Sequence, residues 1–396
     1  MKAESWGPHG ILFSGHNPTM EGGVTDSRIT DCRIENVGLG AKFGGGIRLA
    51  WGSARNQVLN NVVHNTGRGG IFGDHSAELV IRNNRVSGSG GEGLGIEIWH
   101  DCPRSLIEDN TSDHWLSVAR SDQSAVRRNV IGADDGTLKY CGIEIIARDT
   151  VVTDNVIKRG AHIGLSVSDK PVKNNVYWGY NTIRDCAEWG AQFQGESGGI
   201  THHYLYRCAF ENTVRGDSRA WYPNDSGHGF RTNGSCWGLV FEDCVFRNNG
   251  GYGVQFGGRD VDSLDFLGSA ITDNRQAAVS GPSQYTALEF SDCKVEGNNS
   301  DQLPAAKPFS SLPPVADFRL PEPIRAGEPV QFQCNSRVAS GIVERLWDFG
   351  DGIPEVTAQP KYAFGQPGKY RVTLVVWDKS GRGGRAEKMI QVLPGK

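Results

Sequence analysis

The sequence predicts an all-β protein that begins as a parallel β-helix solenoid and ends in a smaller β-domain. One short unit recurs along the first three quarters of the 396-residue chain: apolar, two residues, a small polar residue, one residue, apolar. A second short strand introduced by glycine accompanies most units. A fixed period of about 20 to 50 residues is typical of a solenoid. Period-two alternation without helical stretches predicts that its elements are strands.

The small polar slot of the unit defines a ladder of eleven rungs, spaced by about 26 residues on average. We expect each slot residue to turn inward and to hydrogen-bond the equivalent residues above and below, because buried turn groups need partners. Where cysteine fills the slot, we expect a buried free thiol. The slot is filled by Cys32, Asn61, Asn84, Asn110, Asn129, Asn155, Asn181, Cys208, Cys244, Ser269 and Cys293.

The repeat, for example Val58/Asn61/Val63 and Val152/Asn155/Ile157, resembles that of the right-handed parallel β-helix superfamily, which includes pectate lyases and polygalacturonases. The resemblance covers roughly residues 10 to 300 and implies a solenoid of about eleven coils over residues 1–302. The resemblance indicates the fold specifically but says little about the reaction, since proteins of one fold carry out many functions.

Composition excludes several classes of function. The formal net charge is −4, so no basic field recruits nucleic acid. No apolar window is long enough to insert into a membrane. The sequence has neither the Cys and His spacing of a zinc site nor a dense Asp cluster for calcium, so we expect no cofactor and no metal. Met1-Lys2-Ala3 does not begin a signal peptide. Nothing in the sequence indicates the oligomeric state.

The repeat stops after Cys293, and residues 303–313 are Pro-rich, which predicts an extended linker between separable domains. Residues 314–396 contain alternating strands around the string Trp347-Asp348-Phe349-Gly350-Asp351-Gly352, and Pro367-Gly368-Lys369-Tyr370 opens the last hairpin. This segment resembles the PKD domain, a small immunoglobulin-like β-sandwich. We expect Trp347 in the sandwich core and the Asp-Gly pairs in a tight turn. The resemblance implies an accessory module of extracellular enzymes and surface proteins, and hence a secreted or cell-surface protein.

Because the inward residues of a solenoid are used for packing, a functional site must use outward side chains of consecutive coils. Aligning the glycine-led strands places Glu97 and Glu144 in one outward row, two coils and roughly 9 to 10 Å apart. Asp74 and Glu97 lie about 8 Å apart on a diagonal by the same geometry. Inverting glycosidases separate their two carboxyl groups by about 6.5 to 9.5 Å. The aligned row is Arg48, Phe72, Glu97, Ser117, Glu144, Ser166, Gln192, Arg231 and Gln255.

Coils two to six bring carboxylates, histidines and arginines together on this face, whereas the later coils offer mainly amides and glycines. The candidate catalytic residues there are Glu97, Glu144, Asp74, His100, Arg120 and Arg148. A carboxyl group beside another in a partly apolar groove has the raised pKa that a general acid needs. His75 and His100, with Arg120 and Arg148, instead suit a lyase that removes a proton next to a uronate carboxylate. A third possibility is a solvated face without catalysis.

Further candidates are one histidine and several aromatic residues. Gly227-His228-Gly229 copies a string that polygalacturonase-type hydrolases carry on a catalytic coil, so His228 joins the catalytic set, although the family's other strings are absent. Aromatic rings near strand ends suit stacking on sugars. The candidate substrate-binding residues are Trp51, Trp99, Trp115, Trp189 and Tyr222.

These observations predict a secreted carbohydrate-active enzyme that cleaves a polysaccharide in a groove on the β-helix. Hydrolysis by paired carboxylates is favoured slightly over β-elimination. The contrasting hypothesis is a non-catalytic surface, adhesion or glycan-binding solenoid protein.

Overall fold

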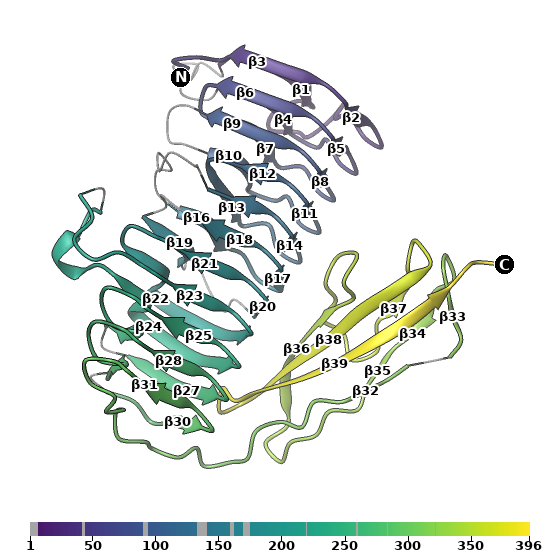
Figure 1. Ribbon diagram of the computed structural model, residues 1–396. Coiled ribbons are helices and arrows are strands. Elements are labelled where there is room, and N and C mark those ends of the chain that lie inside the picture. The colour runs from purple at the N-terminus through teal and green to yellow at the C-terminus, as the bar shows by residue number, and fades with distance from the viewer. Residues whose placement is uncertain are drawn as a thin grey trace.

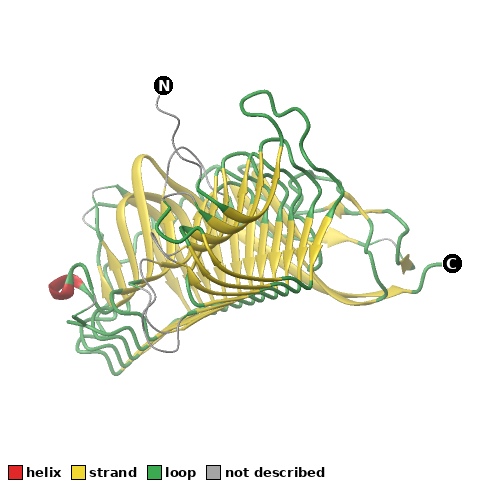
Figure 2. Cartoon of the chain, turned by 90° about the horizontal axis from the view of Figure 1, so that it is seen from above, coloured by secondary structure: helices red, strands yellow, loops and turns green. Residues whose placement is uncertain are grey.

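The protein is a long parallel β-solenoid with a β-sandwich docked against its side (Figure 1). The computed structural model describes residues 7–41, 44–89, 94–132, 141–158, 162–168, 175–218, 220–258, 260–282, 284–320 and 322–396, and of residues 196–198 only the backbone. Seen from above, the coils stack behind one another, and the loop that carries the short 3-10 helix η1 (Pro223–Asp225) projects at one side (Figure 2). Among the described residues, no helix has the length and hydrophobicity needed to cross a bilayer.

Three walls of parallel strands make up the solenoid, and each wall is named here by its outward surface. The first face consists of β1 (His9–Ser14), β4 (Gly45–Ala50), β7 (Gly69–Asp74), β10 (Leu94–Trp99), β13 (Trp115–Ala119), β16 (Cys141–Ile146), β19 (Ile163–Ser168), the first parts of β22 (Trp189–Tyr206) and β24 (His228–Glu242), β26 (Val254–Phe256) and β29 (Val279–Ser280).

The second face consists of β2 (Arg28–Thr30), β5 (Gln57–Leu59), β8 (Val80–Arg82), β11 (Leu106–Glu108), β14 (Ala125–Arg127), β17 (Thr150–Thr153), β20 (Val176–Gly179), the last parts of β22 and β24, β27 (Val261–Leu267) and β30 (Leu288–Ser291). The third face consists of β3 (Arg33–Val37), β6 (Val62–Thr66), β9 (Arg85–Ser89), β12 (Thr111–Ser112), β15 (Val130–Ile131), β18 (Val156–Lys158), β21 (Thr182–Arg184), β23 (Ala209–Glu211), β25 (Val245–Arg247), β28 (Ala270–Thr272) and β31 (Lys294–Glu296).

The inward side chains of the first face form columns of aliphatic and aromatic residues. Ile47, Ile71 and Ile96 are Cα partners in successive strands, and all three are fully buried. Trp178 is also fully buried, as its position at the head of a repeat unit predicts, and its indole donates to His203 Nδ1 at 3.0 Å. The core therefore fills the inside of the solenoid, and only outward side chains remain for chemistry.

The predicted ladder is confirmed. Six asparagines stack in one column, where each Oδ1 accepts the backbone N–H of the preceding rung at 2.9 to 3.1 Å. Cys208 continues the column at 3.8 Å from Asn181 Nδ2, and Cys244 N–H donates to Ser269 Oγ at 3.1 Å. All nine cysteines are free thiols, but Cys32 and Cys293, at the two ends of the ladder, are only partly buried, which differs from the expected burial. A second ladder of Asn249, Asn274 and Asn298, with amide contacts of 2.9 and 2.7 Å, was not anticipated.

Asn129→Ala should lower the free energy of unfolding by at least about 2 kcal/mol, because unmet buried groups cost about 1 to 3 kcal/mol each. Asn129 Oδ1 accepts from both the backbone and the side chain of Asn110, while its Nδ2 donates to Ile107 O and Asn155 Oδ1. Urea unfolding measures the loss. Asn299→Ala, which truncates an exposed asparagine, is the control, and equal losses in both variants would contradict the ladder's role.

The C-terminal sandwich contains β32 (Phe318–Arg319), β33 (Ile324–Arg325), β34 (Val330–Gln331), β35 (Gln333–Cys334), β36 (Ile342–Asp348), β37 (Lys361–Tyr362), β38 (Gly368–Asp378) and β39 (Gly383–Leu393). Trp347 is fully buried against Phe332 and Phe349, as predicted. Asp348 Oδ1 accepts the N–H of Gly350 at 2.8 Å, so the Asp-Gly string makes the expected turn.

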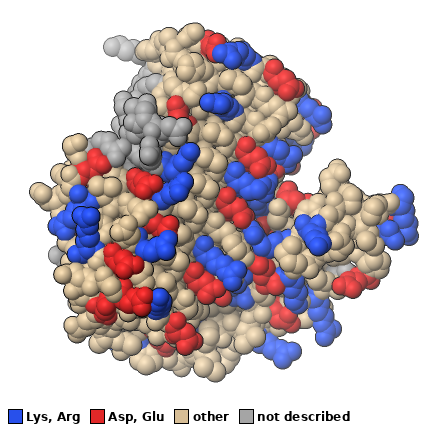
Figure 3. All heavy atoms as spheres, in the orientation of Figure 1, with Lys and Arg blue, Asp and Glu red and all other residues tan. Residues whose placement is uncertain are grey.

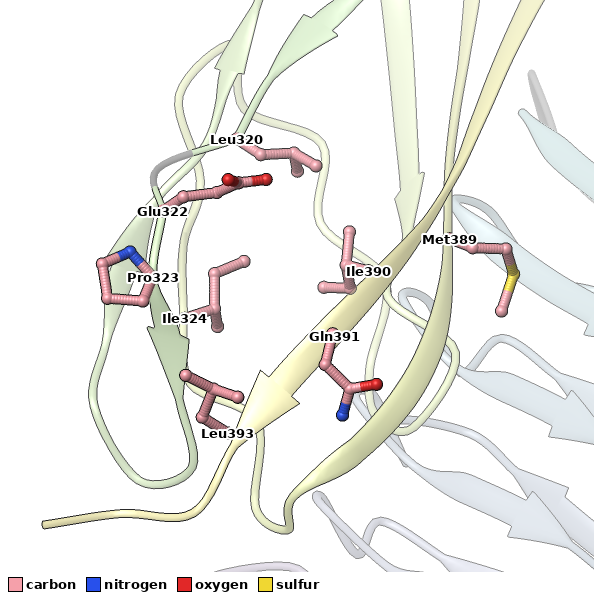
Figure 4. Close-up of a pocket in the computed structure, with 8 residues that line it drawn as sticks. All are labelled: Leu320, Glu322, Pro323, Ile324, Met389, Ile390, Gln391 and Leu393. Carbon is pink, nitrogen blue, oxygen red and sulfur yellow. The ribbon is translucent and has the colours of Figure 1, made fainter.

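A cavity of about 620 Å³ lies at the far edge of the sandwich, between β33 and the last part of β39 (Figure 4). Met389 at its rim is 64% exposed. The cavity is lined by Leu320, Glu322, Pro323, Ile324, Met389, Ile390, Gln391 and Leu393. Since aliphatic side chains dominate this lining, the cavity does not offer the paired acid and base groups of a hydrolytic site.

The sandwich packs on the second face of the solenoid. Trp377 and Val375 join an apolar cluster with Tyr177, Tyr204 and Val240 of the solenoid. The linker is also held, because Lys307 pairs with Leu288 through two backbone hydrogen bonds of 2.9 Å. Charged contacts cross the interface as well, at Arg127–Asp348, Arg382–Asp265 and Arg385–Glu242. The Pro-rich sequence predicted stiffness but not this docking.

Candidate functional site

The first face presents its outward side chains in rows that run along the solenoid axis. The strand register places Glu97, Ser117 and Glu144 opposite one another in β10, β13 and β16. The register continues through Ser166, Gln192, Arg231 and Gln255, which is the row that the sequence predicts. A second row carries Asp74 and Trp99 side by side. The face therefore brings the two candidate glutamates into line, two strand spacings apart.

Glu144 is partly buried beside an apolar cluster on the first face. The cluster consists of Cys141, Ile163 and Trp189, with Trp115 packed against it. Ser117 Oγ donates to Glu144 Oε2 at 2.8 Å. Burial raises the pKa of Glu144 from 4.5 to about 7, and the hydrogen bond from Ser117 opposes this rise only in part. A raised pKa of this kind is the property that sequence reasoning sought in a general acid.

Glu97 is more deeply buried than Glu144 and has a charged neighbour. Its side chain lies 3.6 Å from Arg68 Nη2, and the residue is 6% exposed. The guanidinium of Arg68 also lies 5.8 Å from the ring of Trp99. The two glutamates of one row thus occupy different environments, one apolar and one ion-paired. Such a difference is what separates an acid from a base in a carboxylate pair.

Asp74 anchors a second polar group at the end of β7. Its Oδ2 accepts from Arg48 Nη2 at 3.0 Å, and both residues are at most 4% exposed. Its Oδ1 lies 2.6 Å from Nδ1 of His75, whose ring stacks on Trp51 at 4.5 Å. A cavity of about 240 Å³ opens beside Arg48 and Trp51 at this end of the face. Asp74 thus orients His75.

His100 occupies the same corner of the solenoid one coil further on. Its ring stacks on Trp99 at 3.8 Å and lies 5.7 Å from that of His75. Arg120 Nη1 is 3.2 Å from His100 Nε2. Burial and the positive charge of Arg120 lower the pKa of His100. Trp51, His75, His100 and Arg120 all have positive φ, between 46° and 51°, and form one stacked column at this corner.

Arg148 stands apart from the carboxylate row. It is exposed in the turn after β16, and its backbone N–H donates to Asp122 Oδ1 at 2.9 Å. The neighbouring Asp149 has its pKa raised by burial, an effect that Asn175 and Arg148 oppose. Arg148 therefore belongs to the rim of the face.

His228 lies in another cluster, three strands beyond Glu144. It is 2% exposed, its Nδ1 accepts the N–H of Tyr252 at 3.0 Å, and its Nε2 lies 3.2 Å from Asp225 Oδ1. Burial lowers its pKa to about 4, against the opposing effect of Asp225. Asp225 also pairs with Arg231 at 2.8 Å and accepts from Gln255 at 3.3 Å. Because both ring nitrogens have partners, His228 holds Asp225 in position.

The loop that carries η1 displays two aromatic rings above this cluster. Tyr222 is 61% exposed and Trp221 is 49% exposed. The fully buried carboxylate of Glu188 accepts the N–H of Tyr222 at 2.8 Å and that of Trp221 at 3.4 Å. The loop is therefore held firmly while its rings face solvent.

The other candidate aromatic residues differ in exposure. Trp51, Trp99 and Trp115 are partly exposed. Trp189, by contrast, is 2% exposed beneath Tyr222, and Arg231 lies 4.5 Å from its ring centroid. Its large ring is used to support the loop.

Sequence reasoning missed several residues that shape the site. Arg68 lies in the turn before β7, outside the aligned strands, and nothing in its local sequence marked it. Asp225 and Glu188 lie in or beside the longest coil, and that excess length was the one available signal. Charged residues of both signs are intermingled in the view of Figure 3, so no single-sign patch points to the site there.

Two family models match the chain. The right handed beta helix region matches residues 9–112, and the PKD domain matches residues 311–392. Collagenase ColQ1 of Bacillus cereus (strain Q1) is 36% identical over 70 residues, which are 17% of this chain and 7% of the collagenase. The chain spans only 7 to 9% of the length of the curated relatives that it matches first. The chain therefore combines a right-handed β-helix region with a PKD domain.

Solved structures match either the sandwich or the solenoid. The PKD1 domain of the Vibrio cholerae metalloprotease PrtV is 34% identical and covers 21% of this chain and 99% of that chain, with a TM-score of 0.19. The receptor binding domain of the Siphovirus 9NA tailspike is 9% identical and covers 95% of this chain and 98% of that chain, with a TM-score of 0.34. At these values the likeness concerns the fold and carries nothing about the reaction.

Proposed function

We propose that the first face of the solenoid binds a polysaccharide and hydrolyses it, with Glu144 as general acid and Glu97 as general base. The raised pKa of Glu144, in line with an ion-paired Glu97, carries this proposal. Their row positions are two strand spacings apart, roughly 9 to 10 Å. This separation is at the upper end of the range for inverting enzymes, about 6.5 to 9.5 Å.

In the proposed reaction Glu144 gives its proton to the glycosidic oxygen as the bond to the anomeric carbon breaks. Glu97 takes a proton from the water that attacks this carbon from the opposite side. Arg68 Nη2 lies 3.6 Å from the Glu97 carboxylate and places a positive charge beside it. Ser117, between the two glutamates, holds the Glu144 carboxyl through its 2.8 Å hydrogen bond. The configuration at the anomeric carbon is inverted.

Aromatic rings and the remaining polar residues would hold the glycan along the axis of the face. Trp51, Trp99 and Trp115 offer partly exposed indole edges, and Tyr222 offers an exposed ring over the later coils. Stacking on such rings favours sugar substrates. His100, Arg120 and Arg148 lie on the same face or its rim and would supply hydrogen bonds to hydroxyl or acidic groups, while the buried Asp74 orients His75.

A second candidate reaction is β-elimination, and one observation favours it. The pair Asp74–His75, joined at 2.6 Å, resembles an imidazole base oriented by a carboxylate, with Arg120 and His100 nearby to stabilise negative charge. A non-catalytic glycan-binding solenoid is the contrasting class, and evenly solvated outward charges would favour it. The enclosure of Arg48, Asp74 and Glu97, each at most 6% exposed, supports an enzyme. Secretion or display at the cell surface is part of the proposal.

A panel of purified polysaccharides tests the proposed function. We expect new reducing ends without ultraviolet absorbance of an unsaturated product, and loss of the new reducing ends in Glu144→Gln. Absorbance from an unsaturated product would replace hydrolysis by β-elimination. Binding of glycans in an affinity gel without any cleavage would instead support a non-catalytic glycan-binding protein.

A further inference from the structure

We infer that Asp74, His75 and His100 form a binding site for a transition-metal ion of the zinc class. One carboxylate oxygen and one nitrogen from each imidazole all lie within 4.8 Å of one another. Two ligand atoms on a shared tetrahedral zinc ion are about 3.3 Å apart, because each bond is about 2.0 to 2.1 Å long. A side-chain movement on the order of 1 Å thus completes the site. This inference does not depend on the proposed cleavage.

The composition of the site selects the class of metal. Two imidazoles and one carboxylate suit Zn²⁺, Ni²⁺ or Cu²⁺, whereas Ca²⁺ and Mg²⁺ require mostly oxygen ligands. His75 Nε2 also lies 3.9 Å from Oδ2 of Asp101, whose side chain is 80% exposed. Asp101 therefore lies beside the site on its solvent side, and the three ligands are Asp74, His75 and His100.

Neighbouring side chains already fix the orientation of the ligands. Trp51 stacks on His75 with an interplanar angle of 14°, and Trp99 stacks on His100 with one of 27°. Arg48 holds the second oxygen of Asp74 at 3.0 Å. Partners of this kind orient metal ligands and contribute about 10-fold to 100-fold to affinity. The ordering cost of binding is correspondingly small.

Arg120 limits the affinity of the site for a metal ion, and this gives the inference a further test. Its guanidinium contacts His100 Nε2 at 3.2 Å, so it competes for a ligand atom and repels a cation. Arg48 offsets the charge of Asp74 in the same way. We therefore expect metal binding in the micromolar range and tighter binding after Arg120 is removed. If the residues of this corner only stabilise the fold, removal of Arg120 should not increase the affinity for metal.

Calorimetric titration of the full-length protein, first treated with a chelator, tests the site with Zn²⁺. We expect one ion bound per chain, no binding of Ca²⁺, and at least tenfold weaker Zn²⁺ binding in His75→Ala and in His100→Ala. Arg120→Ala should bind Zn²⁺ several-fold more tightly. His64→Ala is the control, because His64 is exposed on the third face and contacts Ser87. Melting curves without metal confirm that the variants fold.

Three results would overturn the inference. They are the absence of Zn²⁺ binding to the parent, unchanged binding in the His75→Ala/His100→Ala double variant, and weaker binding in Arg120→Ala. Thiols are the competing ligands, since the chain has nine free cysteines. Replacing Zn²⁺ with Co²⁺ distinguishes thiolate ligands from imidazole ligands. Thiolate ligands give intense near-ultraviolet charge-transfer absorption, and imidazole ligands do not.

Discussion

Asp348→Ala should lower the free energy of unfolding by about 3 to 5 kcal/mol, the usual cost of leaving one partner of a buried ion pair alone. Arg127, on β14 of the solenoid, is 1% exposed, and Asp348, on β36 of the sandwich, is 2% exposed. The guanidinium of Arg127 donates to the carboxylate of Asp348 and to the carbonyl of Gly352. Without Asp348 this buried positive charge loses the carboxylate to which it donates a hydrogen bond.

Asp348→Asn removes the negative charge of Asp348 but keeps the hydrogen bond that supports the turn. An asparagine still accepts the N–H of Gly350, which Asp348 accepts at 2.8 Å, so only the ion pair is lost. We expect this variant to lose most of the same stability, and the double variant Arg127→Met/Asp348→Asn to recover part of it, because an apolar side chain is tolerated where an unpaired charge is not.

Urea unfolding with intrinsic tryptophan fluorescence measures these differences. Lys388→Ala is the matched control, since Lys388 pairs with Asp317 at 3.0 Å near the surface of the sandwich, and exposed pairs contribute about 0 to 1 kcal/mol. Equal, small losses in Asp348→Ala and Lys388→Ala would mean that the sandwich does not depend on this contact and moves independently of the solenoid.

The period of the repeat made the ladder and the outward rows predictable. Side chains alternate across a strand, so one correct alignment of the glycine-led strands fixes every row. Asn129, Glu97 and Glu144 therefore fall where the sequence places them. The docking of the sandwich was not predictable, because Arg127 and Asp348 are 221 residues apart and the local sequence around each residue does not identify the other as its partner.

The environment of each site residue was the harder part. The row places Glu97 and Glu144 alike, yet Arg68 reaches one of them from a turn, and an apolar cluster with Trp189 encloses the other. The position of Trp189 near a strand end suggested exposure, whereas the long loop that covers it depends on Glu188, a distant tertiary partner. Position in a solenoid follows from periodicity, but burial follows from loops whose paths the sequence does not reveal.

Glu144→Gln should reduce polysaccharide cleavage by about a hundredfold to ten-thousandfold, the usual contribution of a general acid. The amide keeps the size of the side chain and still accepts the hydrogen bond from Ser117, so loss of the transferable proton is the main change. In the parent protein kcat/KM should fall as pH rises through about 7, because Glu144 then loses its proton.

The same substitution should raise the stability of the folded protein above neutral pH, although it lowers the cleavage rate. The pKa of Glu144 is raised in the folded protein from 4.5 to about 7, so the unfolded chain gives up this proton at lower pH than the folded one. The parent therefore loses stability between about pH 4.5 and 7, by about 3 kcal/mol for a shift of this size. Glu144→Gln has no such loss, so at pH 8 it should unfold at higher urea concentration than the parent, and at pH 4 at nearly the same concentration.

Glu296→Gln makes the same chemical change on the third face, where Glu296 forms an exposed pair with Lys294 at 2.7 Å. It should leave both the cleavage rate and the pH dependence of stability unchanged. A Glu144→Gln protein that cleaves at the parental rate would remove Glu144 from the mechanism, even if its stability at pH 8 rises as expected. Since the stability gain requires only a buried carboxyl and the rate loss requires a proton donor, the two measurements together distinguish an enclosed glutamate from a catalytic one.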